Sequence, residues 1–179
     1  MRPPKAPRIL EVQWHVPPVG WLKVNTDGSA FGSPGLAGCG GIFRTSRGFF
    51  KGAFAISLGK CFAFEAELAG AIHAISYSWD FGWKNLWLES DSSYLVTLLK
   101  AHSPSVPWRW KPSWLRCIDR ISKMNFHVSH IFREGNSVAV LLASGATSIQ
   151  APTWWHHTPS FIQEAFYKDY SGRCNFHFS

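Results

Sequence analysis

Apolar and polar residues alternate along positions 21–27 of the chain. Such alternation is typical of a β-strand with one buried face, and Gly28 is expected to end this strand. Two further strands are predicted at residues 35–45 and 48–56, joined by a tight turn at residues 46–48. The three segments together predict an antiparallel meander.

A different periodicity follows the meander. Between residues 62 and 79, apolar side chains recur at intervals of three and four, which predicts a helix with one buried face. Shorter patterns of both kinds continue to residue 146. They predict strands at 85–90 and 125–132 and helices at 91–100, 114–124 and 135–146. This order of elements predicts an α/β fold, in which helices flank a mixed sheet.

The two ends of the chain lack such patterns. Residues 1–20 hold five prolines together with Arg2, Lys5 and Arg8, which predicts a basic leader in an extended, polyproline-like conformation outside the core. Residues 147–179 are aromatic without a recognisable period. We therefore predict three parts, namely a leader at 1–20, a folded domain at 21–146 and a C-terminal aromatic extension at 147–179.

The charge of the chain bears on its partner. Its 179 residues include 18 Lys and Arg against 11 Asp and Glu, which gives a formal net charge of +7. A basic domain of this size favours a polyanionic partner. Charged residues are only 16% of the chain and apolar residues 46%, so we expect a folded core rather than disorder.

Composition also bears on the cellular compartment. No apolar run approaches the roughly 18 residues of a membrane-spanning helix, and the first residues lack the apolar segment of a secretory signal. We expect no contact with membranes and an intracellular protein, in the nucleus or the cytoplasm. The four cysteines lack C-x-x-C spacing, which favours reduced, mostly buried thiols over disulfides or a zinc site.

Acidic residues are few, and several lie where predicted elements end. Asp27 ends the first strand, where it can hold a cation or form an Asx turn into Gly28. Asp91 follows the fourth strand, where a helix N-cap is the ordinary role of an aspartate. Glu65 and Glu67 lie about 160° apart around the first helix, so both cannot face one site. The helical pattern does not choose between them and allows both to be solvated.

Four ordered blocks carry a family resemblance. They comprise residues 24–29 (VNTDGS), 64–72 (FEAELAGAI), 86–92 (LWLESDS) and 130–136 (HIFREGN). Together they resemble the ribonuclease H superfamily, most closely the plant ribonuclease H-like (type 1) domain of non-LTR retroelement and reverse-transcriptase-like proteins. The resemblance covers about residues 21–146 and implies a five-stranded mixed sheet, three strands antiparallel and two parallel, flanked by helices.

The resemblance also implies an activity. Members of this family hydrolyse the RNA strand of RNA–DNA hybrids with two Mg²⁺ ions, for which Mn²⁺ can substitute. By resemblance, Asp27, Glu67 and Asp91 are the catalytic, metal-binding acids, and Glu65 is a bystander. Hard carboxylate oxygens suit Mg²⁺, and crowded carboxylates are tolerable when metal ions neutralise them.

The chain departs from the family at the fourth acid. The family's last block reads Arg-Glu-x-Asn-x-x-Ala-Asp, whereas residues 133–140 place Val140 at the position of the aspartate. Valine cannot bind a metal, and Glu134 lies six residues earlier. Two hypotheses follow. The domain is either a hybrid-specific endonuclease impaired by Val140, or an inactive module that still binds nucleic acid.

Substrate contacts are predicted at two places. Gly28 and Ser29 follow the first acid, where backbone and small polar groups can contact the A-like minor groove of a hybrid. Beyond the aromatic and basic segment 108–111, Arg116 and Arg120 are predicted to contact phosphates of the DNA strand. The alternative is that the tryptophans of this region pack a helix on the sheet and the charges are solvated.

One histidine lies close to the expected site. His130 falls on the last strand in alternation with Val128 and Phe132, so we interpret it as a packed histidine rather than a proton shuttle. The expected partner of the whole domain is an RNA–DNA hybrid, bound by a monomer.

Overall fold

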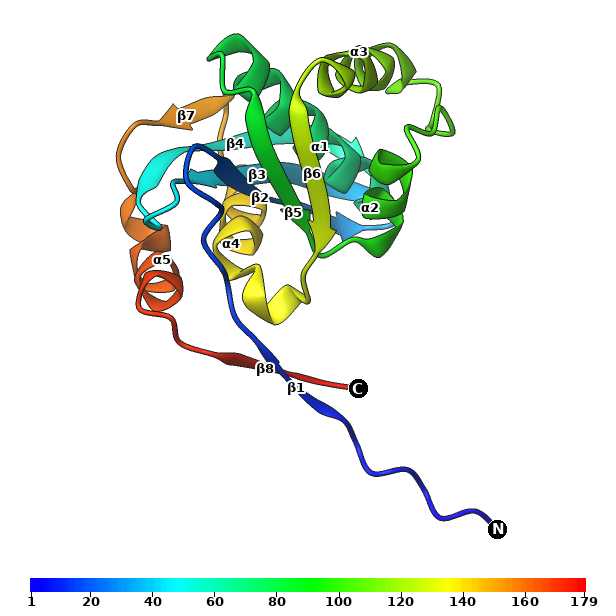
Figure 1. The fold of residues 1–179 in the computed structure, drawn as a ribbon. Coiled ribbons are helices and arrows are strands. Elements are labelled where there is room, and N and C mark those ends of the chain that lie inside the picture. The colour runs from blue at the N-terminus through cyan, green and yellow to red at the C-terminus, as the bar shows by residue number, and fades with distance from the viewer.

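A six-stranded mixed sheet forms the centre of the computed structural model, which describes residues 1–179 (Figure 1). β2, β3 and β4 are antiparallel neighbours, and β5 and β6 continue the sheet in parallel from β2. The strand order is β6-β5-β2-β3-β4-β7. The strands of this sheet are β2 (Leu22–Gly32), β3 (Gly35–Arg44), β4 (Phe50–Cys61), β5 (Asn85–Ser90), β6 (Asn125–His130) and β7 (Thr153–Trp155). The predicted mixed sheet is confirmed, and β7 adds a sixth strand.

Helices cover both faces of this sheet. The helices are α1 (Ala63–Asp80), α2 (Ser93–Lys100), α3 (Lys111–Ser122), α4 (Ser137–Ala146) and α5 (Gln163–Tyr170), with 3₁₀ turns η1 (Arg133–Gly135) and η2 (Ser160–Ile162). The main core lies where α1, α2 and α3 pack on one face, with Leu68 and Ile75 against Val24 and Leu88. α4 packs on the opposite face of β2, β3 and β4. Burial of these apolar stripes accounts for the helical periodicities of the sequence.

The first strand is longer than predicted. β2 continues through Gly28 to Gly32, so Asp27 lies inside a strand rather than at its end. Gly28 has no left-handed backbone conformation, and it pairs with Cys39 in an unbroken ladder. The parallel pairing with β5 does stop at Thr26 and Ser90. Asp27 therefore lies where the parallel pairing of β2 with β5 ends. Asp91, which follows Ser90, lies at the same edge of the parallel strands.

The leader prediction was wrong in part, because the chain ends form ordered structure. β1 (Ile9–Val12) pairs antiparallel with β8 (Asn175–Phe178), and this two-stranded ribbon extends from the body of the domain (Figure 1). Trp14 is buried against the sheet residues Lys23 and Arg44. The unassigned extension contributes β7, η2, α5 and β8. These elements escaped the sequence pattern because they are short and are stabilised by partners distant in sequence.

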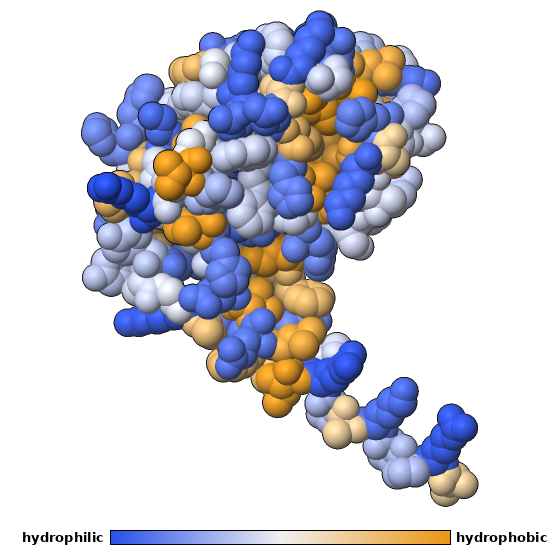
Figure 2. All heavy atoms as spheres, in the orientation of Figure 1, coloured by the Kyte–Doolittle hydropathy of each residue, from blue (hydrophilic) through white to orange (hydrophobic).

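Apolar side chains are not confined to the core. Figure 2 shows a group of them on the ribbon, where Ile9 is 60% exposed and Phe178 is 67% exposed. None of the helices combines the length and the hydropathy that crossing a bilayer requires. Three of the four free cysteines are buried, and only Cys174 is exposed.

Candidate active site

Three carboxylates from separate elements meet at the carboxyl end of the parallel strands. Asp27 comes from β2, Glu67 from the second turn of α1, and Asp91 from the residue that follows β5. One oxygen of each lies within 4.8 Å of the other two. Asp27 is buried, and Glu67 and Asp91 are half-buried. A cluster of this kind offers hard oxygen ligands to a divalent cation.

Local structure explains why these three side chains converge. A Cβ atom on Gly28 would lie 2.1 Å from the backbone of Ala66 and Glu67, so only glycine lets α1 approach β2 this closely. Ser92, not Asp91, is the N-cap of α2, because the Ser92 hydroxyl accepts a hydrogen bond from the Leu95 N–H. Asp91 is thereby left free for the cluster.

The electrostatics of the cluster fit a divalent cation. Burial, followed by the charge of Asp91, raises the pKa of Asp27 to about 8. Burial also raises the pKa of Glu67 and that of Asp91. Both oxygens of Asp27 and one oxygen of Asp91 are buried without a hydrogen-bond donor. Buried carboxylates without donors are costly, and a bound divalent cation would satisfy them. The residues present therefore fit a metal centre.

A cationic side chain lies beside the cluster. Arg133 Nη1 is 3.9 Å from Asp27 Oδ2 and 3.9 Å from Asp91 Oδ2, and the Arg133 side chain is 64% exposed. Its charge lowers the pKa of both carboxyl groups, against the larger effect of burial. His130 also lowers the pKa of Asp91. His130 is exposed, with its ring edge-on to Phe132, so our interpretation of His130 as a packed histidine was wrong.

A network of buried side-chain amides lies next to the cluster and is bonded to the strand that carries Asp27. Asn136, just before α4, donates through Nδ2 to the carbonyl of Thr26 (3.0 Å). Its Oδ1 accepts a hydrogen bond from Asn25 Nδ2 (3.1 Å), which also donates to Glu89 Oε1 (2.9 Å). Asn25 Oδ1 in turn accepts from Trp14 Nε1 at 2.8 Å. Because these groups are buried and paired, they fix the backbone that carries Asp27.

The network continues into both chain ends. Arg44 donates to Asn25 Oδ1 (3.0 Å) and forms a buried ion pair with Asp169 of α5 (2.8 Å). Lys23 pairs with Glu89 (3.0 Å) and donates to the backbone carbonyl of His15 (2.9 Å). The leader and the extension are thus connected to β2 and β3, the leader through Lys23 and Asn25 and the extension through Arg44.

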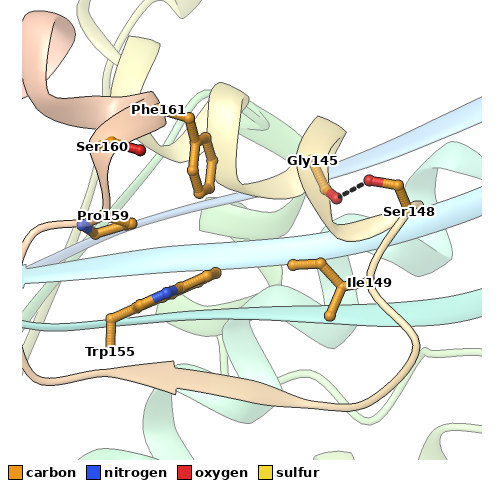
Figure 3. Close-up of a pocket in the computed structure, with 7 residues that line it drawn as sticks. All are labelled: Gly145, Ser148, Ile149, Trp155, Pro159, Ser160 and Phe161. Carbon is orange, nitrogen blue, oxygen red and sulfur yellow. Dashed lines mark hydrogen bonds between the residues drawn. The ribbon is translucent and has the colours of Figure 1, made fainter.

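A pocket elsewhere on the domain lacks ionisable groups. It has a volume of about 570 Å³ and lies between the end of α4 and the segment from β7 to η2. Figure 3 shows Trp155 and Phe161 on two of its walls, and Ser148 Oγ donating to the carbonyl of Gly145. Since this pocket offers no acid, base or cation, the carboxylate cluster is the stronger candidate for chemistry.

Comparison with known proteins places the chain in a family. A family model described as reverse transcriptase-like matches residues 25–146. The chain belongs to the reverse transcriptase-like family. An Arabidopsis thaliana protein that carries the provisional name of a ribonuclease H protein is 34% identical over 154 residues. The alignment covers 80% of this chain and 23% of that protein, so the chain spans about a quarter of its length.

Solved structures show the fold of this reverse transcriptase-like chain. Ribonuclease H1 of Halobacterium salinarum has a TM-score of 0.64 at 23% identity, over 71% of this chain and 97% of the other. LC11-RNase H1, isolated from compost, was solved with an RNA/DNA hybrid. That structure has a TM-score of 0.62 at 22% identity, over 70% of this chain and 96% of the other. The ribonuclease H-like fold implied by the sequence blocks is confirmed.

The structure separates the two glutamates, which the helical pattern alone left equivalent. Glu67 lies in the acidic cluster of this reverse transcriptase-like domain. Glu65 faces away from it, accepting hydrogen bonds from the Phe62 backbone N–H (3.2 Å) and from Trp110 Nε1 (2.8 Å). Val140 lies half-buried in the first turn of α4, and the cluster contains three acids rather than four.

The predicted substrate contacts remain predictions. Gly28 is buried under α1, and Ser29 follows it half-buried on β2. Arg116 is exposed on α3, which packs against α1, the helix that carries Glu67. Arg120 is half-buried, donates to Ser76 Oγ (3.4 Å) and lies over the ring of Trp79. None of the four belongs to the acidic cluster itself.

Two residues of the site were given no role in the sequence analysis. Arg133 and Asn136 both belong to the block Arg-Glu-Gly-Asn, which served to support the family resemblance and to locate the missing fourth acid. A polar run between a strand and a helix, at the edge where the other acids converge, could have indicated them. Their partners Asp27 and Thr26 are more than 100 residues away, so the contacts themselves could not be predicted.

Proposed function

We propose that this domain is an RNA–DNA hybrid ribonuclease that cleaves the RNA strand endonucleolytically with two divalent metal ions. The observation that carries the proposal is the cluster of Asp27, Glu67 and Asp91, with ligand atoms within 4.8 Å of one another. The family and the ribonuclease H-like fold support it. A structure with this fold, LC11-RNase H1, was solved with an RNA/DNA hybrid, which supports the choice of substrate.

In this proposal the chain's own residues hold the metals and the substrate. Asp27, Glu67 and Asp91 would hold two Mg²⁺ ions, or Mn²⁺ in their place. Bound Mg²⁺ would supply an activated water molecule and would neutralise charge on the phosphate. Arg133, exposed beside the carboxylates, would contact a phosphate of the substrate, for which a guanidinium is well suited.

The remaining contacts orient the hybrid in this proposal. Gly28 and Ser29 would contact the minor groove beside the metals. Arg116, exposed on α3, would contact phosphates of the DNA strand, and Arg120 would support it. We propose that the domain acts as a monomer inside the cell, where RNA–DNA hybrids form.

A binding module without turnover is the second candidate, and one observation favours it. Val140 replaces the fourth acid with an apolar side chain, so one metal would have fewer ligands than in the family. A hybrid would still be attracted by the net charge of +7 and by Arg133 beside the cluster.

One experiment separates the two functions. The purified domain is incubated with an RNA–DNA hybrid labelled on the RNA strand, with Mg²⁺ or with Mn²⁺, beside the variants Asp27→Asn and Val140→Asp. Cleavage by the unmodified protein that is lost in Asp27→Asn supports the enzyme. Cleavage only in Val140→Asp supports the binding module, since it means that the missing ligand abolished turnover. Cleavage that persists in Asp27→Asn contradicts the proposed site.

A further inference from the structure

A second concave site lies on the same sheet as the carboxylates. It has a volume of about 420 Å³ and is lined by Pro18, Trp21, Trp87 and His127, which we call the aromatic cleft. α2 and α3 pack against β6 from the core side, and α4 covers β2, β3 and β4 on the opposite face. β5 and β6 thus face the viewer in Figure 1 without a helix over them. The volume falls within the range of small-ligand sites.

The wall of the cleft is fixed in place. Trp87 Nε1 donates to Ser129 Oγ at 2.7 Å, and the buried ammonium of Lys23 lies 3.8 Å from the Trp87 ring centroid. His127 meets the Trp87 ring edge-on, with centroids 5.5 Å apart. Because the ring is already oriented, a planar ligand would lose little of its binding energy to ordering it.

The cleft and the carboxylates share two parallel strands. Trp87 and His127 are paired in register. Asp91 is four positions after Trp87, so at about 3.3 Å per residue about 13 Å of strand separates the backbone of the cleft from that of the acidic cluster. The intervening surface carries Ser129, on the same face of β6 as His127, and at its end the exposed Arg133. The exposed guanidinium of Arg133 can donate hydrogen bonds to a phosphate at the carboxylate end of this path.

We propose that the aromatic cleft binds an unpaired nucleobase of the RNA strand that flanks the hybrid. This proposal rests on the proposed function, because continuity with the carboxylate site selects the ligand. Bases stack on aromatic rings without strong sequence preference. A separation of about 13 Å corresponds to about four stacked nucleotides, so the flank would begin close to the cleavage position. The cleft thereby favours hybrids with a single-stranded RNA end over fully paired hybrids.

Binding assays with a chelator present test the cleft without any metal. A fully paired hybrid is compared with hybrids that carry an RNA flank at the 5′ or the 3′ end. We expect one of the two flanks to tighten binding about tenfold, as stacking of one or two bases would. Trp87→Ala should abolish this gain and Trp87→Phe should retain most of it, since a phenyl ring still stacks without donating to Ser129.

Trp155→Ala is the matched control, because Trp155 is also half-buried but lies on β7, at the opposite edge of the sheet. It should leave the gain unchanged. Equal affinity for paired and flanked hybrids overturns the proposal, as does a gain that survives Trp87→Ala. A proline-rich peptide that binds in a Trp87-dependent manner, when no RNA flank does, overturns it too.

The cleft and the ribonuclease activity can fail separately. If paired hybrids are cleaved but a flank does not change affinity, the proposal that the aromatic cleft binds a nucleobase is rejected and the proposed function is retained. A Trp87-dependent flank preference in a protein that cleaves no hybrid supports the cleft and rejects the enzyme.

Discussion

The imidazole of His177 stacks on the phenyl ring of Phe132, with centroids 3.9 Å apart and planes 8° from parallel. The same imidazole is bonded through Nδ1 to Glu134 at 3.0 Å. Residues 132 and 134 flank Arg133, whose guanidinium lies beside Asp27 and Asp91. The last strand of the chain therefore holds the residue that precedes Arg133 and the one that follows it.

His177→Ala is expected to weaken hybrid binding through Arg133. Without the stack and the hydrogen bond, the loop becomes more mobile and the guanidinium less well placed, so we expect about fivefold weaker binding in the presence of a chelator. The change should be negligible when Arg133→Ala is already present. Titration of labelled hybrid in this double-mutant cycle measures the coupling. Phe176→Ala, a change on the exposed neighbour, is the control. Additive effects of His177→Ala and Arg133→Ala would contradict the link.

Metal binding should depend on pH through Asp27. Its pKa of about 8 means that the folded, metal-free protein keeps a proton there that the unfolded chain loses near the ordinary value of 3.8. The stability of the metal-free protein therefore falls as pH rises from about 4 to about 8. Mg²⁺ must displace this proton, so its affinity should rise by up to about tenfold per pH unit and level off above about pH 8.

Calorimetric titration of Mg²⁺ across this pH range provides the measurement. The stability of metal-free Asp27→Asn is the control, because this change removes the titrating group while preserving side-chain volume, and should abolish the fall in stability between about pH 4 and about pH 8. An Mg²⁺ affinity that stays constant between about pH 6 and about pH 8 is incompatible with a raised Asp27 pKa.

Gly28→Ala is expected to destabilise the domain by about 3 kcal/mol or more. The added Cβ would lie 2.1 Å from backbone atoms of Ala66 and Glu67, which cannot rotate away as a side chain can. α1 would have to shift, and Glu67 would move out of the cluster. Urea denaturation measures the loss. Gly145→Ala in α4 is the matched control, since its Cβ meets only the exposed ring of Phe161 and should be neutral or mildly stabilising.

Asp169→Asn is expected to cost about 3 to 5 kcal/mol in the free energy of unfolding. Arg44 is buried, and this change leaves its guanidinium without a counter-charge. The double variant Arg44→Met, Asp169→Leu should recover much of the loss, because it removes both charges. Chemical denaturation of the three proteins checks this. Equal stability of Asp169→Asn and the unmodified protein would mean that α5 is not fixed to the sheet by this pair.

The domain interior was predictable from sequence because its periodic patterns are long. The stripe of α1 and the alternation of β5 each report a buried face, and β5 occupies the predicted residues 85–90. Asp27 could be located at the end of the alternation at residues 21–27, and Asp91 directly after the alternation at residues 85–90. The choice of Glu67 over Glu65 depended on the family resemblance. Helical geometry alone showed only that the two side chains cannot both face one site.

The chain ends were not predictable for a physical reason. β1 and β8 are four residues each, and each is paired only with the other. The paired residues are far apart in the chain, 169 positions for Ile9 and Phe178 and 163 positions for Val12 and Asn175. The sequence pattern of such short strands cannot be distinguished from that of a loop. The same holds for Trp14 and Asp169, whose importance arises from hydrogen bonds to Asn25 and Arg44 that only the folded chain creates.

The β1–β8 ribbon brings the two ends of the chain together. Arg8 and Ser179 exchange backbone hydrogen bonds in both directions, at 3.1 Å and 3.0 Å, so the two points at which the polypeptide leaves the domain coincide. A short linker between them would turn the protein into a ring without moving the carboxylates. New termini could then be opened at the turn around Gly82, where no neighbouring atom lies within 4 Å of an added Cβ. The domain that carries the three carboxylates thus has residues 8 and 179 at one point of its structure.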